Sequence, residues 1–282
     1  MKLSLSTRVA ESFRDKRDAA VELEDLAQIA EREGYYAICM RASQVGVDDS
    51  REKIRSAGAT LAENNLAVSM VTGDFAIPEN SGDGPSALRN IDPYLDLADD
   101  LGCDLLRICM KTADDIEWAR TAADAAQERG MRIAHQCHTQ SLFETIDETL
   151  EILRSVGRSN FGLIYEPANL ELCGQPYVGD ALEALYPWIF NVYLQNQRVD
   201  LNGADSINTW CRGAVRFDQY PLWEEGGLDV SRILDELDRQ GYNGYVTVHQ
   251  ASASLGGAEE AARRSARALR SIGPFEDRKA PQ

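Results

Sequence analysis

The chain contains three histidines, and each stands at the carboxyl end of a short apolar segment that is typical of a β-strand. Alternation along such a strand places Gln136 and His138 on one face and His135 on the other. An imidazole titrates near neutrality, so His138 and His249 are candidates for proton transfer. We expect His135 to be a structural residue that faces a helix.

A carboxylate and a row of amides occupy similar places on two other segments. Glu166 closes an apolar strand and is followed by a proline. Tyr193, Gln195 and Gln197 alternate onto one face of a later strand, and Arg198 follows them. A carboxylate at a strand end is a candidate for chemistry, whereas the amides could bind hydroxyl groups or a metal ion, or could simply line a polar interior.

The elements that must position these residues follow a repeating pattern. An amphipathic helix ends in a glycine, and a short apolar strand follows it. The four clearest helix ends carry Gly34, Gly102, Gly130 and Gly241. Completing the pattern predicts eight strands, near residues 3–6, 36–41, 67–72, 105–110, 132–138, 162–166, 190–196 and 244–249.

Strands that alternate with helices predict an α/β fold with a parallel sheet, and eight of them predict a single-domain (β/α)8 TIM barrel over residues 1–273. Neither the dinucleotide-binding nor the P-loop glycine motif follows any strand, which disfavours a nucleotide-binding sheet. Residues 73–85 and 199–227 are expected to be loops on the side where barrel active sites lie. Residues 274–282 are expected to form a C-terminal tail.

Composition limits the partners of the chain. A formal net charge of −17 over 282 residues disfavours nucleic acid and anionic membranes. The chain begins without an apolar signal segment and has no long apolar run, so we expect a cytoplasmic protein. The six cysteines are dispersed and are expected to be reduced. A homo-oligomer is possible, but nothing in the sequence indicates an interface.

Four runs carry a resemblance to a known family. They are residues 133–138, 143–145, 161–169 and 241–249, and they resemble the xylose-isomerase-like barrels, often called sugar phosphate isomerases/epimerases. The resemblance spans essentially the whole chain and is strongest from residue 131 onward. It implies a small carbohydrate substrate and a divalent metal, which in the family is held by glutamate, aspartate, histidine and a second glutamate.

Every one of those ligand positions is changed here. The resemblance places the metal on Gln136, Glu166, Gln195 and His249, with the family histidine falling near Tyr193 or Gln195. Oxygen donors with one imidazole would suit Mn²⁺, with Mg²⁺, Co²⁺ or Zn²⁺ as alternatives. The affinity should be lower than with three carboxylates. The predicted catalytic residues are His138, Glu166 and His249, with His138 as the preferred general base.

Other residues at the same end of the predicted strands are candidates for substrate binding. Arg107, Lys111 and Arg198 could hold a phosphate or a polarised oxygen, although arginine–carboxylate bridging is an alternative role. Trp223 could stack on a sugar ring or could anchor its own loop. Tyr193 and Gln197 complete the predicted binding set, whereas residues 145–148 fit a helix capping box and are assigned no chemistry.

The resulting hypothesis is a metal-dependent enzyme that isomerises or epimerises a sugar or keto-sugar by removing a proton next to a carbonyl. Gln136 cannot accept a proton, so the two-glutamate epimerase mechanism of the family is not available. A lyase or dehydratase acting on a keto-sugar or keto-cyclitol is equally compatible with one base. A catalytically inactive carbohydrate-binding barrel or partner subunit is a further alternative, whereas a DNA endonuclease of the same superfamily is disfavoured by the acidic composition.

Overall fold

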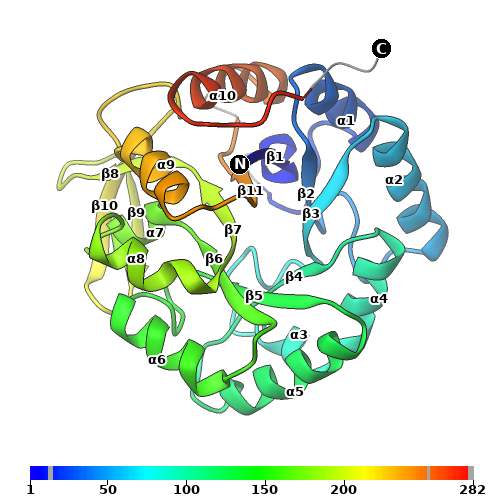
Figure 1. The fold of residues 1–282 in the computed structure, drawn as a ribbon, viewed down its shortest axis with the longest axis horizontal. Coiled ribbons are helices and arrows are strands. Elements are labelled where there is room, and N and C mark those ends of the chain that lie inside the picture. The colour runs from blue at the N-terminus through cyan, green and yellow to red at the C-terminus, as the bar shows by residue number, and fades with distance from the viewer. Residues whose placement is uncertain (12–14, 253–254, 279–282) are drawn as a thin grey trace.

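The predicted barrel is confirmed by the computed structural model, which describes residues 1–11, 15–252 and 255–278. Eight parallel strands close in the order β1, β11, β7, β6, β5, β4, β3, β2 (Figure 1). Their bounds are β1 Lys2–Ser6, β2 Ala37–Arg41, β3 Ala67–Thr72, β4 Leu105–Ile108, β5 Arg132–Gln136, β6 Phe161–Tyr165, β7 Ile189–Leu194 and β11 Tyr245–Val248.

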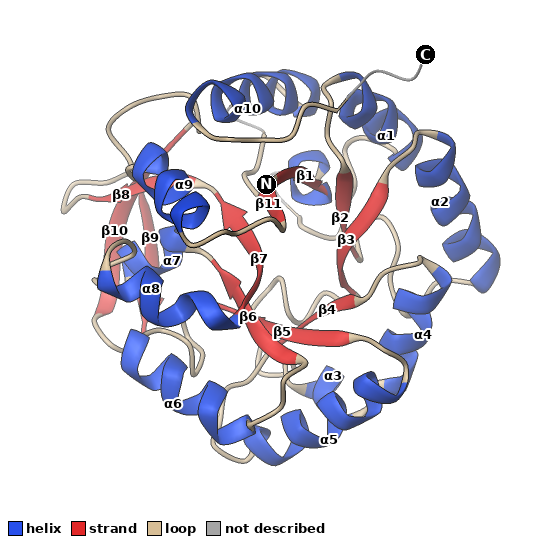
Figure 2. Ribbon diagram, in the orientation of Figure 1, coloured by secondary structure: helices blue, strands red, loops and turns tan. Residues whose placement is uncertain are grey.

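Helices form an outer ring around the strands, as Figure 2 shows. They are α1 Leu23–Arg32, α2 Arg51–Glu63, α3 Ser86–Arg89, α4 Asp92–Asp100, α5 Asp115–Glu128, α6 Ile146–Val156, α7 Pro167–Leu172, α8 Asp180–Leu185, α9 Val230–Arg239 and α10 Ala258–Ile272. Helical spacing explains how they pack. In α9, for example, Val230, Ile233, Leu234 and Leu237 form one buried stripe against the sheet.

Local signals at the helix ends agree with the structure. Gly34, Gly102, Gly130 and Gly241 all have positive φ, between 65° and 82°, which a residue with a Cβ rarely adopts. The predicted capping box is also present, because the Thr145 side chain accepts a hydrogen bond from the Glu148 backbone N–H at the start of α6.

The barrel interior is closed by packed side chains, including a few paired polar ones. Ser4 Oγ lies 2.7 Å from Ser69 Oγ, and Thr247 Oγ1 donates to Asn191 Oδ1 at 3.1 Å. These pairs satisfy polar groups that are fully shielded from water, so that the interior costs little in lost hydrogen bonds. The strands are buried on both faces, which explains why their sequences are nearly continuous apolar runs.

The expectation of a loop over residues 199–227 was wrong in part. A three-stranded antiparallel sheet stands there, formed by β8 (Asn196–Val199), β10 (Gly213–Tyr220) and β9 (Asp205–Thr209) in that order. Val215 and Phe217 alternate along β10 and pack with Leu172 in a small core of their own. Their period of two was the signal for a strand. The loop predicted over residues 73–85 is confirmed.

Residues 274–278 of the expected tail lie against the barrel. Phe275 packs on the main core, the Glu276 backbone N–H donates to the Met1 carbonyl at 2.9 Å, and Arg278 donates to the Asn65 carbonyl at 2.8 Å. Residues 279–282 lie outside the described part of the chain. Among the residues that the structure describes, no helix has the length and apolar character needed to cross a membrane.

Candidate active site

A cavity of about 360 Å³ opens at the carboxyl ends of the barrel strands. Each of the eight barrel strands contributes a lining residue, either directly or through the loop that follows it. The strand-end residues on its wall include Arg41, Arg107, Gln136, Glu166 and His249. Parallel strands bring their carboxyl ends to one rim, which is why residues distant in sequence meet here.

Glu166 lies at the centre of this cavity's polar contacts. It follows β6 and occupies the N-cap position of α7, where Pro167 starts the helix because proline needs no N–H partner at that position. Its side chain is fully buried. Oε1 accepts a hydrogen bond from Gln195 Nε2 at 2.6 Å, and Oε2 accepts from Asn169 Nδ2 at 2.6 Å and from Gln136 Nε2. The partners of this carboxylate are therefore neutral amides.

This environment raises the pKa of Glu166 to about 8. Burial is the main cause, because the charged form loses its hydration. The positive charge of Arg107 and the hydrogen bonds from Gln195 and Asn169 oppose the shift without cancelling it. Glu166 therefore takes up and releases a proton close to physiological pH, which is the property of a general acid or base.

Arg107 lies on β4 with only 4% of its surface exposed. Within residues 1–11, 15–252 and 255–278 it has no hydrogen-bond or ion-pair partner, and its Nε is buried without an acceptor. Burial lowers the pKa of this guanidinium, but an arginine stays protonated under ordinary conditions. The cavity therefore contains a buried positive charge with which no carboxylate of the described residues forms an ion pair.

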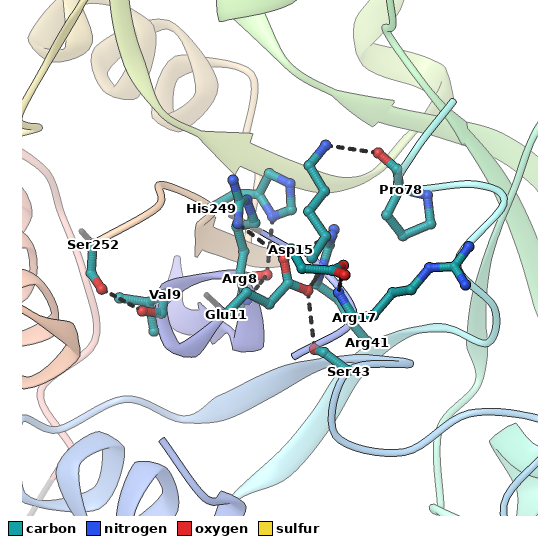
Figure 3. Close-up of polar contacts among 12 residues, drawn as sticks. Arg8, Val9, Glu11, Asp15, Arg17, Arg41, Ser43, Pro78, His249 and Ser252 are labelled. Atoms are coloured by element: carbon teal, nitrogen blue, oxygen red, sulfur yellow. Dashed lines mark hydrogen bonds and ion pairs between the residues drawn. The ribbon is translucent and has the colours of Figure 1, made fainter. Parts of the chain in front are cut away.

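A second group of charges on the wall is paired within the protein. Figure 3 shows Glu11 between two arginines and a serine. Arg41 donates to the Glu11 carboxylate at 2.5 and 3.2 Å, Arg8 donates at 3.1 Å and Ser43 Oγ at 3.0 Å. Lys16 extends over the same region, and its Nζ donates to the Pro78 carbonyl at 3.0 Å.

Burial and nearby positive charges favour the neutral form of the three histidines. Burial lowers the pKa of His138 to about 3 and that of His249 well below its usual range. His138 Nδ1 lies 2.8 Å from the Thr139 carbonyl, which fixes the proton on Nδ1 and leaves Nε2 as an acceptor. His249 stacks on Tyr193 with ring centroids 3.9 Å apart. His138 is consequently a weaker candidate for the general base than Glu166.

The predicted structural role of His135 agrees with its surroundings. Its ring stacks on Phe143 at 3.9 Å, and Nδ1 lies 2.6 Å from the Gln136 carbonyl. The ring is 2% exposed and does not line the cavity. Strand alternation thus separates His135 from His138 as the sequence predicted.

The predicted substrate-binding residues fall into two groups. Arg107 and Gln197 line the cavity, and Tyr193 lies buried against His249. Lys111, Arg198 and Trp223 lie outside it. Lys111 Nζ donates to two backbone carbonyls, Arg198 is exposed above the Tyr220 ring, and the Trp223 ring is covered by the Arg264 guanidinium at 4.3 Å.

Among the residues of the cavity wall that sequence reasoning missed, four bear directly on its charges and on Glu166, namely Arg8, Lys16, Arg41 and Asn169. Arg8 and Arg41 follow or close the first two strands, so their positions at strand ends were the available signal. Asn169 stands three residues after Glu166, which brings the two side chains to one side of a helical turn. No sequence signal indicated Lys16.

The donor chemistry of this site does not fit a divalent cation. Glu166 is the only carboxylate among the four predicted ligands, and both its oxygens are taken by amide N–H groups. His249 Nδ1 contacts Ser6 Oγ at 3.0 Å, and the charge that acts most strongly on Glu166 is that of the cation Arg107. Divalent metals in oxygen sites need negative charge around them, whereas this cavity is lined by an excess of cations.

One other group within the described residues has metal-like spacing, formed by Glu144, Cys173 and Cys211. The Glu144 oxygens, however, accept backbone hydrogen bonds from Gln140, Trp210 and Cys211 at 2.5 to 2.8 Å. We assign Glu144 a structural role, because these bonds tie the turn between β9 and β10 to the loop after β5.

Comparison with known proteins supports the fold. Residues 26–272 match the family model described as xylose isomerase-like TIM barrel. No curated protein matches the chain significantly.

Solved structures extend this likeness over nearly the whole chain. The probable 3-DHS dehydratase AsbF from Bacillus anthracis superposes with a TM-score of 0.73 at 18% identity, covering 96% of this chain and 99% of that one. A xylose isomerase-like TIM barrel protein from Mycobacterium smegmatis in complex with magnesium gives 0.68 at 18%, covering 96% and 97%. D-psicose 3-epimerase from Clostridium cellulolyticum H10, solved with D-tagatose, gives 0.67 at 13%, covering 96% and 99%. At these identities the likeness shows the fold alone.

Proposed function

Because this chain belongs to the xylose isomerase-like TIM barrel family, we propose that it is an enzyme that isomerises a small sugar or keto-sugar by proton abstraction next to a carbonyl. The observation that carries the proposal is Glu166, a fully buried carboxylate on the cavity wall whose pKa is raised to about 8. Support comes from its position directly after β6, since barrel active sites generally lie at the carboxyl ends of the strands.

In the proposed reaction, ionised Glu166 takes the proton from the carbon next to the carbonyl. The electron pair of the broken C–H bond forms a carbon–carbon double bond, and the π pair of the carbonyl moves onto its oxygen to give an enolate. Protonated Glu166 then returns the proton to the former carbonyl carbon. A hydroxyl proton moves between the two oxygens, so that the carbonyl and the hydroxyl exchange positions. Arg107 stabilises the negative oxygen, since its guanidinium has no other partner.

Amide groups orient the substrate in this proposal. Gln136 Oε1 is buried and accepts no hydrogen bond from the described residues, so it is available to a substrate hydroxyl. Gln195 and Asn169 hold the Glu166 carboxylate in place. The resemblance to the family implies a divalent metal, but this mechanism uses none, because the four residues predicted to bind it do not fit a divalent cation.

A second candidate function is the elimination of a leaving group from the carbon beyond the enolate, as in a dehydratase. One base is enough for this reaction, and Glu166 is the one carboxylate on the wall whose described partners are all neutral. The same enolate forms first. Its electron pair then forms a carbon–carbon double bond as the β C–O bond breaks, and the β-hydroxyl leaves as water with the proton that Glu166 had taken. The products distinguish the two reactions.

Proton exchange tests the proposal directly. Keto-sugars, their acids and their phosphates are incubated with the protein in D₂O, and ¹H NMR follows the loss of signal at the carbon next to the carbonyl. We expect exchange with at least one compound and a decrease of about 10³-fold in Glu166→Gln, which keeps the shape but removes the base. Glu128→Gln, an exposed change at the end of α5, is the control.

Two results would count against the proposal. Exchange that persists in Glu166→Gln would remove Glu166 from the reaction. No exchange across the whole panel, with a folded wild-type protein, would favour a barrel that binds carbohydrate without transforming it.

A further inference from the structure

The charges on the cavity wall do not balance. Four basic side chains line the cavity, namely Arg8, Lys16, Arg41 and Arg107, together with the carboxylates of Glu79 and Glu166. Arg8 and Arg41 share the carboxylate of Glu11 behind the wall, and Glu79 pairs with Arg17 at 2.8 Å. In the described part of the chain, no carboxylate lies within ion-pair distance of Arg107 or Lys16.

Of these two cations, Arg107 gives the stronger evidence for a missing negative partner. A cation removed from water without a counter-charge is costly, and proteins rarely keep one without a partner. Arg107 is 4% exposed, and its buried Nε has no acceptor. The side chain nevertheless lines the cavity, so a ligand that enters it meets the charge of this guanidinium.

Glu166 does not serve as that acceptor. Its charge and that of Arg107 influence each other, but among the described residues no ion pair within 4.0 Å joins them. Both Glu166 oxygens already accept hydrogen bonds from amides. Arg107 is therefore free to bind a second negative group.

Lys16 belongs to the same positive region of the cavity wall. Its pKa is lowered to about 8, mainly by burial and further by the charges of Arg8, Arg41 and Arg107. An anion placed among these cations would reverse that effect. The lysine and the arginines thus form one positive region inside a protein whose formal net charge is −17.

We propose that the substrate carries a carboxylate or a phosphate monoester, and that Arg107 and Lys16 bind this anionic group. The inference rests on the proposed function, since it names the class of compound from which Glu166 removes a proton. Arginine matches the two oxygens of such groups with paired N–H donors, and lysine adds a point charge. Sugar acids and sugar phosphates fit this description, whereas unmodified sugars leave both cations without a partner.

Binding is measured by isothermal titration calorimetry, apart from any turnover. The probes are D-gluconate, D-glucose 6-phosphate and the neutral polyol D-glucitol, each at low and high salt. We expect at least one anionic probe to bind ten times or more tightly than glucitol and to weaken with salt. Which of the two anions binds better identifies a carboxylate or a phosphate site.

Variants locate the site. Arg107→Gln and Lys16→Met should each weaken binding of the anionic probe by tenfold or more, whereas Arg55→Gln removes an exposed charge on α2 and should have no effect. Equal affinity for glucitol, or unchanged affinity in both cavity variants, would overturn the inference. So would one equivalent of Mn²⁺ or Mg²⁺ that the wild type binds and Glu166→Ala does not, measured by elemental analysis.

The two proposals can fail separately. Anion binding that depends on Arg107, without proton exchange in any compound, would leave the inference standing and remove the proposed function. Proton exchange in neutral keto-sugars, with no preference for anions, would leave the proposed function standing and remove the inference.

Discussion

Two fully buried carboxylates stand at the same end of the barrel in opposite electrostatic situations. Glu11 is surrounded by Arg41, Arg8 and the hydroxyl of Ser43, and its charge is neutralised within the protein. Glu166 receives its hydrogen bonds from neutral amides, and burial raises its pKa to about 8. The comparison shows how one rim holds a structural ion pair and a group suited to exchange a proton.

The arginines divide in the same way. Arg41 is 2% exposed and forms two hydrogen bonds with Glu11, whereas Arg107 is 4% exposed and has no partner among the described residues. A paired buried cation serves the fold, but an unpaired one is retained at a cost in stability. Such a cost is common at functional sites, so the unpaired half of the rim is where ligands should act.

The largest effect on stability is expected from Glu11→Gln. This change leaves the buried guanidinium of Arg41 facing a neutral amide, and breaking a buried pair from one side costs about 3–5 kcal/mol. The melting temperature should therefore fall by at least several degrees in a thermal unfolding scan. Glu79→Gln, which breaks an exposed pair with Arg17, is the control and should melt like the wild type. A variant at Glu11 that keeps the wild-type melting temperature would show that the pair is not structural.

The pH dependence of Glu166→Gln is the second test. The folded pKa is raised from 4.5 to about 8, so the native state holds a proton that the unfolded state releases between these values. The contribution of the Glu166 carboxyl to the free energy of unfolding is thus full below pH 4.5. It is lost as pH rises to 8, by about 1.4 kcal/mol per pH unit. We expect the wild type and Glu166→Gln to have the same melting temperature at pH 4.5. Toward pH 8 the variant should become progressively more stable than the wild type.

The three histidines do not disturb this comparison. Burial lowers the pKa values of His135, His138 and His249, so these residues change their protonation only at acid pH. They are present in both proteins and cancel in the difference between melting temperatures. A difference that does not change with pH would mean that Glu166 titrates as an ordinary glutamate.

A gain in stability is expected from Arg107→Met. The change removes an unpaired buried charge and fills its place with a flexible apolar side chain, which should stabilise the protein by about 1–3 kcal/mol. Arg41→Met is the matched comparison and should destabilise, because it removes the main partner of Glu11. Denaturant unfolding at neutral pH measures both. If both variants changed the free energy of unfolding in the same direction, the division of the rim into a paired and an unpaired half would be contradicted.

The strands, the helix ends and part of the site could be predicted because they depend on local patterns. Alternation and the glycines at helix ends located the strands, and parallel strands necessarily bring Gln136, Glu166 and His249 to one rim. That inference needs no knowledge of how the loops fold.

Residues beyond the strand ends were predicted less well. Lys111 and Arg198 stand within a few residues of a strand end, but the Lys111 ammonium is held by the Asn80 and Gln140 carbonyls. Alternation along β8 puts Gln197 on the cavity wall and leaves Arg198 exposed. The pairing of Glu11 with Arg41 joins residues 30 positions apart, and sequence spacing does not show it. The unbalanced charge of the cavity follows from these pairings, so it appears only when all of them are known.

The smallest effect is expected from Gln195→Met, which removes one N–H donor from the Glu166 carboxylate. That hydrogen bond favours the ionised form, so the pKa of Glu166 should rise further, by about one unit. The measurement is the pH at which the stability difference between Gln195→Met and the double variant Gln195→Met/Glu166→Gln stops growing. Gln219→Met, which lines the same cavity without a hydrogen bond to Glu166, is the control and should leave that pH unchanged. A shift to lower pH would mean that the amides do not stabilise the Glu166 anion, and the contrast with the arginine-bound Glu11 would lose its physical basis.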